Sequence, residues 1–181
     1  LDLSNNKMLN SINIENNKLI TFVLGNNEKL EYLIAHNNQL SELNVSNNIN
    51  LKKINVSTNK IKVIDVSNNI LLTDLLVSKN YLTNLNLNNN IALTTLYANN
   101  NKLENLILGE IENLMYLYLS ENQLIELDVS KNKKLVELSV DENQLTKLNI
   151  NGATALERLS VGFNQLNSLD VRTNSKLTTL Y

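Results

Sequence analysis

Apolar and polar residues alternate along the chain in a unit of 21 residues that returns without an insertion. Each unit reads LxxLxVxxNx and then LxxLxVxxNxx, ten residues followed by eleven. Leu-x-Val with polar neighbours has a period of two, so each half predicts a short strand with its aliphatic side chains turned inward. The first apolar column holds leucine in every unit: Leu9, Leu30, Leu51, Leu72, Leu93, Leu114, Leu135, Leu156 and Leu177.

One such strand cannot bury its apolar face alone, whereas identical coils stacked in register make a continuous core. Two strands per coil predict two parallel sheets, back to back, with little or no helix. If both sheets advance by the same spacing, roughly 4.8 Å per strand, the stack curves little. The pattern therefore predicts a mainly β solenoid of low curvature, with residues 1–181 as a single repeat domain of about 8.6 coils, 181 residues at 21 per coil.

An asparagine closes the ten-residue half of every unit that reaches this position. Asparagine suits tight or left-handed backbone and can bond to unpaired peptide groups. Stacked in register, the side chains can also bond to their copies in the next coil. We interpret this column as a structural ladder: Asn17, Asn38, Asn59, Asn80, Asn101, Asn122, Asn143 and Asn164.

The eleven-residue half also closes with asparagine, except at Ile111 and Ala153. Neither side chain can make the hydrogen bonds of the turn, and Gly109 and Gly152 supply backbone freedom nearby. We expect these two coils to turn differently from the others.

The unit resembles the leucine-rich repeat, whose signature is L-x-x-L-x-L-x-x-N/C-x-L. Across the whole chain, the nested ten and eleven residues are similar to the bacterial subclass called IRREKO and to internalin J-like repeats. A column that is often cysteine in those repeats is Ile14, Ala35 and Val56 here, so there is no cysteine ladder. The resemblance implies a secreted or cell-surface bacterial protein that binds or adheres, but no particular ligand. No polar cap is visible at either end, so we expect attachment to further domains of a longer chain.

Composition narrows the possible partners. Asparagine supplies 37 of 181 residues beside abundant aliphatics, which argues against disorder. The net charge is −2 with interspersed signs, so neither nucleic acid nor an anionic membrane is an expected partner. The absence of cysteine excludes a disulfide framework and a thiolate metal site, no apolar run predicts membrane insertion, and nothing calls for a cofactor.

Tyrosines gather on one predicted sheet. Five of the six fall on the two outward columns of the ten-residue half, and none falls on the other sheet. Exposed aromatic patches favour protein or glycan contacts, although tyrosine is also a good strand residue that stacks on its neighbour. The predicted binding surface comprises Tyr32, Ile34, Leu76, Tyr97, Tyr116 and Tyr118.

Catalytic and metal signals are weak. Glu121, Asp141 and Glu142 meet at one turn of adjacent coils, where they form either a calcium site or a solvated acidic edge. His36 has no second histidine or thiol and is interpreted as a surface residue. Asp74 and Glu137 lie three coils apart, too far for a catalytic pair.

These observations favour a non-catalytic interaction or adhesion module that binds a protein or glycan ligand through the tyrosine-bearing sheet. A passive spacer or scaffold within a larger protein is one alternative. A polysaccharide-acting β-solenoid enzyme is the other, and it would need convergent acid, base or metal ligands in one groove.

Overall fold

The computed structural model describes residues 1–181 as a solenoid of short parallel strands without helix. The strands of the ten-residue halves form one unbroken parallel sheet, which we call the first face. Each residue of a strand pairs with the residue 21 positions later, as Leu75 does with Leu96. Its strands, in spatial order, are β1 (Ser11–Asn13), β2 (Tyr32–Ile34), β3 (Lys53–Asn55), β4 (Asp74–Leu76), β6 (Thr95–Tyr97), β8 (Tyr116–Tyr118), β10 (Glu137–Ser139), β12 (Arg158–Ser160) and β13 (Thr179–Leu180).

The eleven-residue halves form the second face, which is paired only in places. Strand β5 (Asn84–Asn86) pairs with β7 (Asn105–Ile107), and β9 (Glu126–Asp128) pairs with β11 (Lys147–Asn149). A single bridge joins Asp2 to Val23. The solenoid of parallel strands on two faces is confirmed, but the second face is not a continuous sheet.

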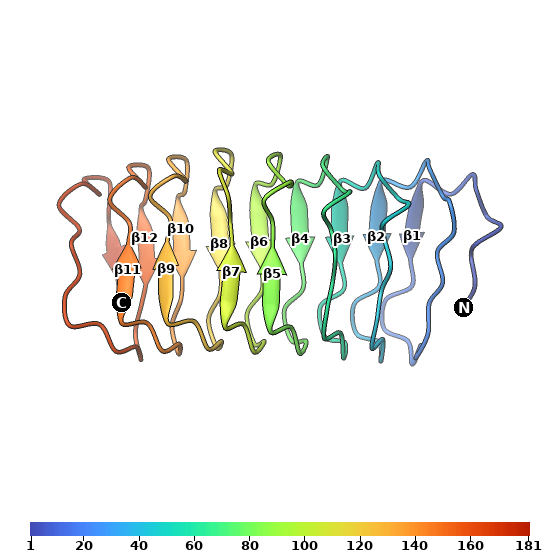
Figure 1. The fold of residues 1–181 in the computed structure, drawn as a ribbon, viewed down its shortest axis with the longest axis horizontal. Helices are drawn as coiled ribbons and strands as arrows, with labels where there is room; N and C mark the ends of the chain where they lie inside the picture. Colours follow the sequence, from blue (N-terminus) through green and yellow to red (C-terminus); the bar gives the residue numbers. More distant parts are fainter.

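The pairing difference has a geometric origin. The first face keeps the hydrogen-bonding distance, roughly 4.8 Å, at every step. Any bend of the stack must then be taken up on the second face, where only some neighbouring strands pair. The coils nevertheless follow one another along one axis with little bend, in agreement with the predicted curvature (Figure 1).

The core is one continuous cluster of 41 buried apolar residues between the two faces. The leucine column that opens the ten-residue half is fully buried from Leu30 to Leu156. Leu9 and Leu177, in the outermost coils, are only partly buried. Stacking therefore buries each coil against its two neighbours, as the repeat predicts.

Each turn after a first-face strand contains one left-handed residue. It precedes the ladder asparagine in every case, so the ladder residue itself does not take this conformation. Only three of the eight are asparagine, although a left-handed conformation costs other residue types roughly 1–2 kcal/mol. These residues, with φ between 51° and 57°, are Asn16, Asn37, Thr58, Lys79, Asn100, Glu121, Glu142 and Phe163.

The ladder side chains join backbone to backbone across coils. The amide nitrogen of Asn80 donates to the carbonyl oxygens of Val56, one coil back, and Val77, each at 3.0 Å. Its amide oxygen accepts from the backbone nitrogen of Ile61 at 3.0 Å. The structural ladder is confirmed. The predicted bonding between copies was wrong, because the peptide groups of the neighbouring coil use both ends of the amide.

The two breaks in the second asparagine column behave differently. At Ile111, Gly109 takes a left-handed φ of 60°, and the backbone nitrogen of Ile111 does not donate to Leu108 as the equivalent nitrogen of the Asn90 turn does to Leu87, so this coil does turn differently. At Ala153 the turn keeps the usual bonds, from Ala153 to Ile150 and from Leu156 to Ala153. The expectation is confirmed at the first break and wrong at the second, since the backbone completes that turn without an asparagine.

Candidate functional site: the tyrosine-bearing face

Three neighbouring strands build the centre of the site. Leu76 on β4, Tyr97 on β6 and Tyr118 on β8 pair in register, so their side chains lie in one outward row. The rings of Tyr97 and Tyr118 stack with centroids 4.4 Å apart and planes 20° apart. The one-coil spacing of the sheet brings the two rings into contact.

A second row lies beside the first, on the same strands. Tyr116 on β8 pairs with Thr95, and Asp74 lies one strand further on. The two rows line an open depression on the first face, which Lys53 borders at one end and Glu137 and Arg158 at the other. Arg158 donates to one oxygen of Glu137 from Nε at 2.8 Å and from its terminal nitrogen at 2.5 Å. The apolar centre therefore has a charged rim, an arrangement typical of recognition surfaces.

Tyr118 is held in its neutral form. Burial raises the pKa of the Tyr118 hydroxyl well above its usual value, and hydrogen bonding with Glu137 and Tyr97 raises it further. A neutral phenol is both a donor and an acceptor, so the centre of the patch can bond to an uncharged partner group.

The six predicted residues separate into two groups. Leu76, Tyr97, Tyr116 and Tyr118 lie together on β4, β6 and β8. Tyr32 and Ile34 lie on β2, and β3 separates that strand from β4. The structure thus brings four of the six side chains into one cluster.

Two of the three acidic turn residues, Asp141 and Glu121, are engaged by other groups of the chain, whereas the carboxylate of Glu142 makes no hydrogen bond or ion pair. Asp141 accepts hydrogen bonds from the hydroxyls of Ser160 at 2.6 Å, Ser139 at 3.0 Å and Ser120 at 3.2 Å. Burial raises the pKa of Asp141, but these bonds outweigh it, and the net pKa is lowered. Glu121 accepts from the side chain of Asn100. No three acidic, histidine or cysteine side chains form a group that could hold a metal ion.

The remaining titratable candidates lie apart from one another. His36 Nε2 lies 2.8 Å from a carboxylate oxygen of Glu15. Asp74 and Glu137 are separated by strands β6 and β8, as the sequence predicted. At roughly 4.8 Å per strand they are about 14 Å apart, beyond the separation of a glycosidase pair.

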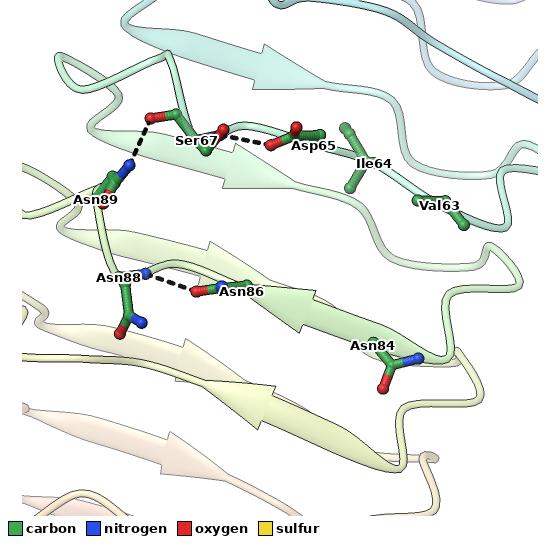
Figure 2. Close-up of a pocket in the computed structure, with 8 residues that line it drawn as sticks. All are labelled: Val63, Ile64, Asp65, Ser67, Asn84, Asn86, Asn88 and Asn89. Carbon is green, nitrogen blue, oxygen red and sulfur yellow. Dashed lines mark hydrogen bonds between the residues drawn. The ribbon is translucent and has the colours of Figure 1, made fainter.

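A hollow on the second face was not predicted from the sequence. Its lining comes from two neighbouring coils that do not pair there, with four asparagines on the side of β5 (Figure 2). One feature of the sequence could have pointed to polar chemistry on this face: the outward column of Asp and Asn residues. Their side-chain oxygens accept a hydrogen bond from the backbone nitrogen two residues later, as Asp65 does from Ser67 at 2.9 Å. That column does not indicate which neighbouring coils remain unpaired on the second face.

The comparisons with known proteins place this geometry in context. No protein-family model and no curated protein sequence matches the chain. Among solved structures, the functional domain of InlJ from Listeria monocytogenes matches with 28% identity and a TM-score of 0.83, over 99% of this chain and 45% of that one. The internalin InlF from Listeria monocytogenes matches with 24% identity and a TM-score of 0.87, over 98% and 56%. YopM, a leucine-rich effector protein from Yersinia pestis, matches with 31% identity and a TM-score of 0.84, over 96% and 49%.

The predicted resemblance is confirmed: the chain is a leucine-rich repeat solenoid similar to internalins. It spans about half the length of these three solved structures. The InlJ domain includes a cysteine ladder, whereas this chain has no cysteine and carries Val56, Val77 and Ala98 in the corresponding inward column. Aliphatic packing and the asparagine ladder therefore hold these coils together without sulfur contacts.

Proposed function

We propose that the chain is a non-catalytic interaction module that binds a protein partner through the tyrosine-bearing first face. The observation that carries the proposal is the row formed by Leu76, Tyr97 and Tyr118, with Tyr116 beside it. Aromatic side chains of this kind supply much of the binding free energy at protein interfaces. The row lies on the unbroken sheet, so it is held rigid before a partner arrives, which lowers the entropy cost of binding.

A protein partner fits this row better than a glycan does. Sugars bind tyrosine by stacking on the ring face, but Tyr97 and Tyr118 present faces to each other at 4.4 Å. Their edges and hydroxyls, together with the charged rim of Glu137 and Arg158, suit the mixed apolar and polar surface of a protein. A glycan ligand on this face is the second candidate, since Tyr116 lies outside the stacked pair of rings.

The proposal includes a location outside the cytoplasm, secreted or attached to a bacterial cell surface. Its support is the resemblance to internalins in repeat length, fold and sequence. The structure has no helix of the length and apolarity needed to cross a membrane.

The test compares two double variants of matched chemistry. Tyr97→Ser with Tyr118→Ser should weaken binding to a partner recovered by crosslinking to intact host cells. Each interface aromatic commonly accounts for 2 kcal/mol or more, roughly thirtyfold in affinity. Ile20→Ser with Ile125→Ser removes exposed apolar side chains outside the first face and should leave binding nearly intact. The proposal fails if the isoleucine pair abolishes binding while the tyrosine pair does not.

A further inference from the structure

A seam between two coils lies open on the second face. Residues 61–69 and 82–90 belong to neighbouring coils whose first-face strands, β4 and β6, are fully paired. On the second face, β5 pairs only with β7, on its far side. The backbone nitrogen of Val66 makes no backbone hydrogen bond, whereas that of Leu87, in the next coil, donates to Ile107 at 2.8 Å. The seam is hollowed along its length (Figure 2).

The seam cannot open further. At one corner the backbone nitrogen of Tyr81 donates to Ile61 at 2.8 Å. At the other corner the side chain of Asn90 donates to the carbonyl of Asn69 at 3.0 Å, and that of Asn89 donates to Ser67 at 3.1 Å. Inserting a peptide strand would require twice the strand spacing, roughly 9.6 Å. The groove therefore excludes a partner strand and can be occupied only by a ligand that side chains recognise.

Polar groups without a partner face this groove. Asp65 uses one carboxylate oxygen to accept from the backbone of Ser67, which leaves the other free. Asn86 uses its amide oxygen to accept from the backbone of Asn88, which leaves its amide nitrogen free. The side chain of Asn88 is turned away from the groove, toward Gly109 of the following coil (Figure 2). Adjacent donors and acceptors of this kind match neighbouring hydroxyls on a ring.

One end of the groove is basic and aromatic. At Val63 it continues into a second depression lined by Lys62, Tyr81, Thr83 and Lys102. The ammonium of Lys102 lies 5.4 Å from the centroid of the Tyr81 ring. Neither lysine takes part in any of the four ion pairs of the structure. Both lysines line this second depression, and its lining contains no acidic residue, so it attracts anions.

We propose that the seam groove binds an acidic oligosaccharide. Its carboxylate or sulfate lies between Lys62 and Lys102, a sugar ring lies against Tyr81 and Val63, and its hydroxyls bond to the side chains further along the seam. From residue 62 to residue 67 the groove is about 17 Å long at 3.3 Å per residue, enough for a short oligosaccharide. This site lies off the first face and is independent of the protein partner proposed above.

The test uses three probes: a tetrameric oligogalacturonate, a sulfated oligosaccharide of similar length, and a hexaglutamate peptide. Calorimetry should detect binding of at least one of the two saccharides and not of the peptide. Lys62→Gln with Lys102→Gln should weaken that binding by about tenfold or more, because hydrogen bonds to charged groups are the strong ones. Asn86→Asp, which places the residue found at Asp65 in the neighbouring coil, keeps the oxygen that caps the turn but removes the free amide donor, and should weaken binding several-fold. The side-chain amide signals of Asn86 should shift on binding, while those of the ladder asparagines should not.

Two control variants test whether binding is specific to this groove. Lys133→Gln with Lys176→Gln changes the net charge equally at exposed positions elsewhere and should leave affinity within about twofold. Tyr97→Ser with Tyr118→Ser should also leave it unchanged. The proposal is overturned if neither saccharide binds at millimolar concentration, if hexaglutamate binds as tightly as the better saccharide, or if either control pair weakens binding as much as the Lys62 and Lys102 pair does.

Discussion

The two faces are built from nearly the same ten residues, yet they differ in how completely their polar groups are paired. On the first face each ladder asparagine from Asn38 to Asn164 uses both ends of its amide, as Asn101 does with Val77 and Leu82. On the second face Asn69 donates to Val45 and Asn48, but its buried amide oxygen has no partner, and the same holds for Asn48 and Asn90. The ten-residue halves therefore pair both ends of their turn asparagines, whereas the eleven-residue halves leave amide oxygens without a partner.

The difference agrees with the separate roles proposed for the two faces. A fully paired sheet holds exposed side chains in fixed positions, which suits a preformed protein-binding row. An incompletely paired one leaves side-chain amides and peptide groups available to a polar ligand. Four measurements on matched positions of the two faces test this difference.

Removing a core leucine should have the largest effect, and more on the first face than on the second. Leu96 is fully buried in the central inward column, so Leu96→Ala should lower the free energy of unfolding by about 2–5 kcal/mol through the cavity it leaves. Leu148, at the corresponding second-face position, keeps 9% exposure, so Leu148→Ala should cost less. Urea unfolding of both variants measures the gap. Equal losses would mean that the open seams do not soften the core.

Removing a ladder asparagine should cost less than removing the leucine, with the same asymmetry. Asn101→Ala leaves four bonds unmade, including the bond accepted from the backbone nitrogen of Leu82 at 3.0 Å, and should cost about 1–3 kcal/mol. Asn69→Ala also removes a buried oxygen that had no partner, so its net cost should be smaller. Chemical denaturation of the two variants provides the comparison, and an equal or larger loss for Asn69→Ala would contradict it.

Hydrogen exchange should report the open seam directly. The backbone nitrogen of Val77, on the first face, donates to Tyr97 at 2.8 Å, whereas that of Val66, on the second face, makes no backbone hydrogen bond. Both side chains are 1% exposed, so access of solvent to the side chain does not distinguish them. The Val66 amide should exchange at least about tenfold faster, equivalent to about 1.4 kcal/mol of opening free energy. Equal protection would show that the seam closes in solution.

Periodicity alone predicted most of the fold. The columns fixed which residues are buried, the parallel register of 21 residues and the structural role of the asparagines. It could not predict which second-face seams open, because that depends on how small differences in spacing accumulate over neighbouring coils. The left-handed turn position was also missed, since Thr58, Lys79 and Phe163 occupy it as readily as asparagine does.

The candidate site was predictable in part. Two-residue alternation placed Leu76, Tyr97, Tyr116 and Tyr118 on one surface, where the structure has them. The close stacking of two rings and the engagement of Asp141 by three serines depend on side-chain rotamers, which repeat length does not determine. The seam groove was missed because each of its asparagines resembles the structural ones in sequence.

Acid titration should give the smallest effect and compares one carboxylate from each face. Hydrogen bonds lower the pKa of Asp141 below its usual 3.8 despite the opposing effect of burial, and the backbone hydrogen bond from Ser67 lowers that of Asp65. A lowered folded-state pKa contributes stability above the unfolded value, and this stability is lost as pH falls below 3.8 through the folded value. Solvent exposure keeps each contribution below about 1 kcal/mol.

The two asparagine substitutions should then differ in kind. Asp141→Asn replaces an acceptor oxygen with a donor in front of serine hydroxyls, so the variant should be less stable at neutral pH and lose less stability on acidification. Asp65→Asn introduces the residue that Asn44, Asn86 and Asn149 already supply in the same column, where its amide oxygen still caps the turn. Stability at neutral pH should therefore hardly change. Unfolding free energies measured from pH 7 to pH 3 test both variants. A larger neutral-pH loss for Asp65→Asn than for Asp141→Asn would show that the second-face caps, rather than the first-face network, stabilise the coils.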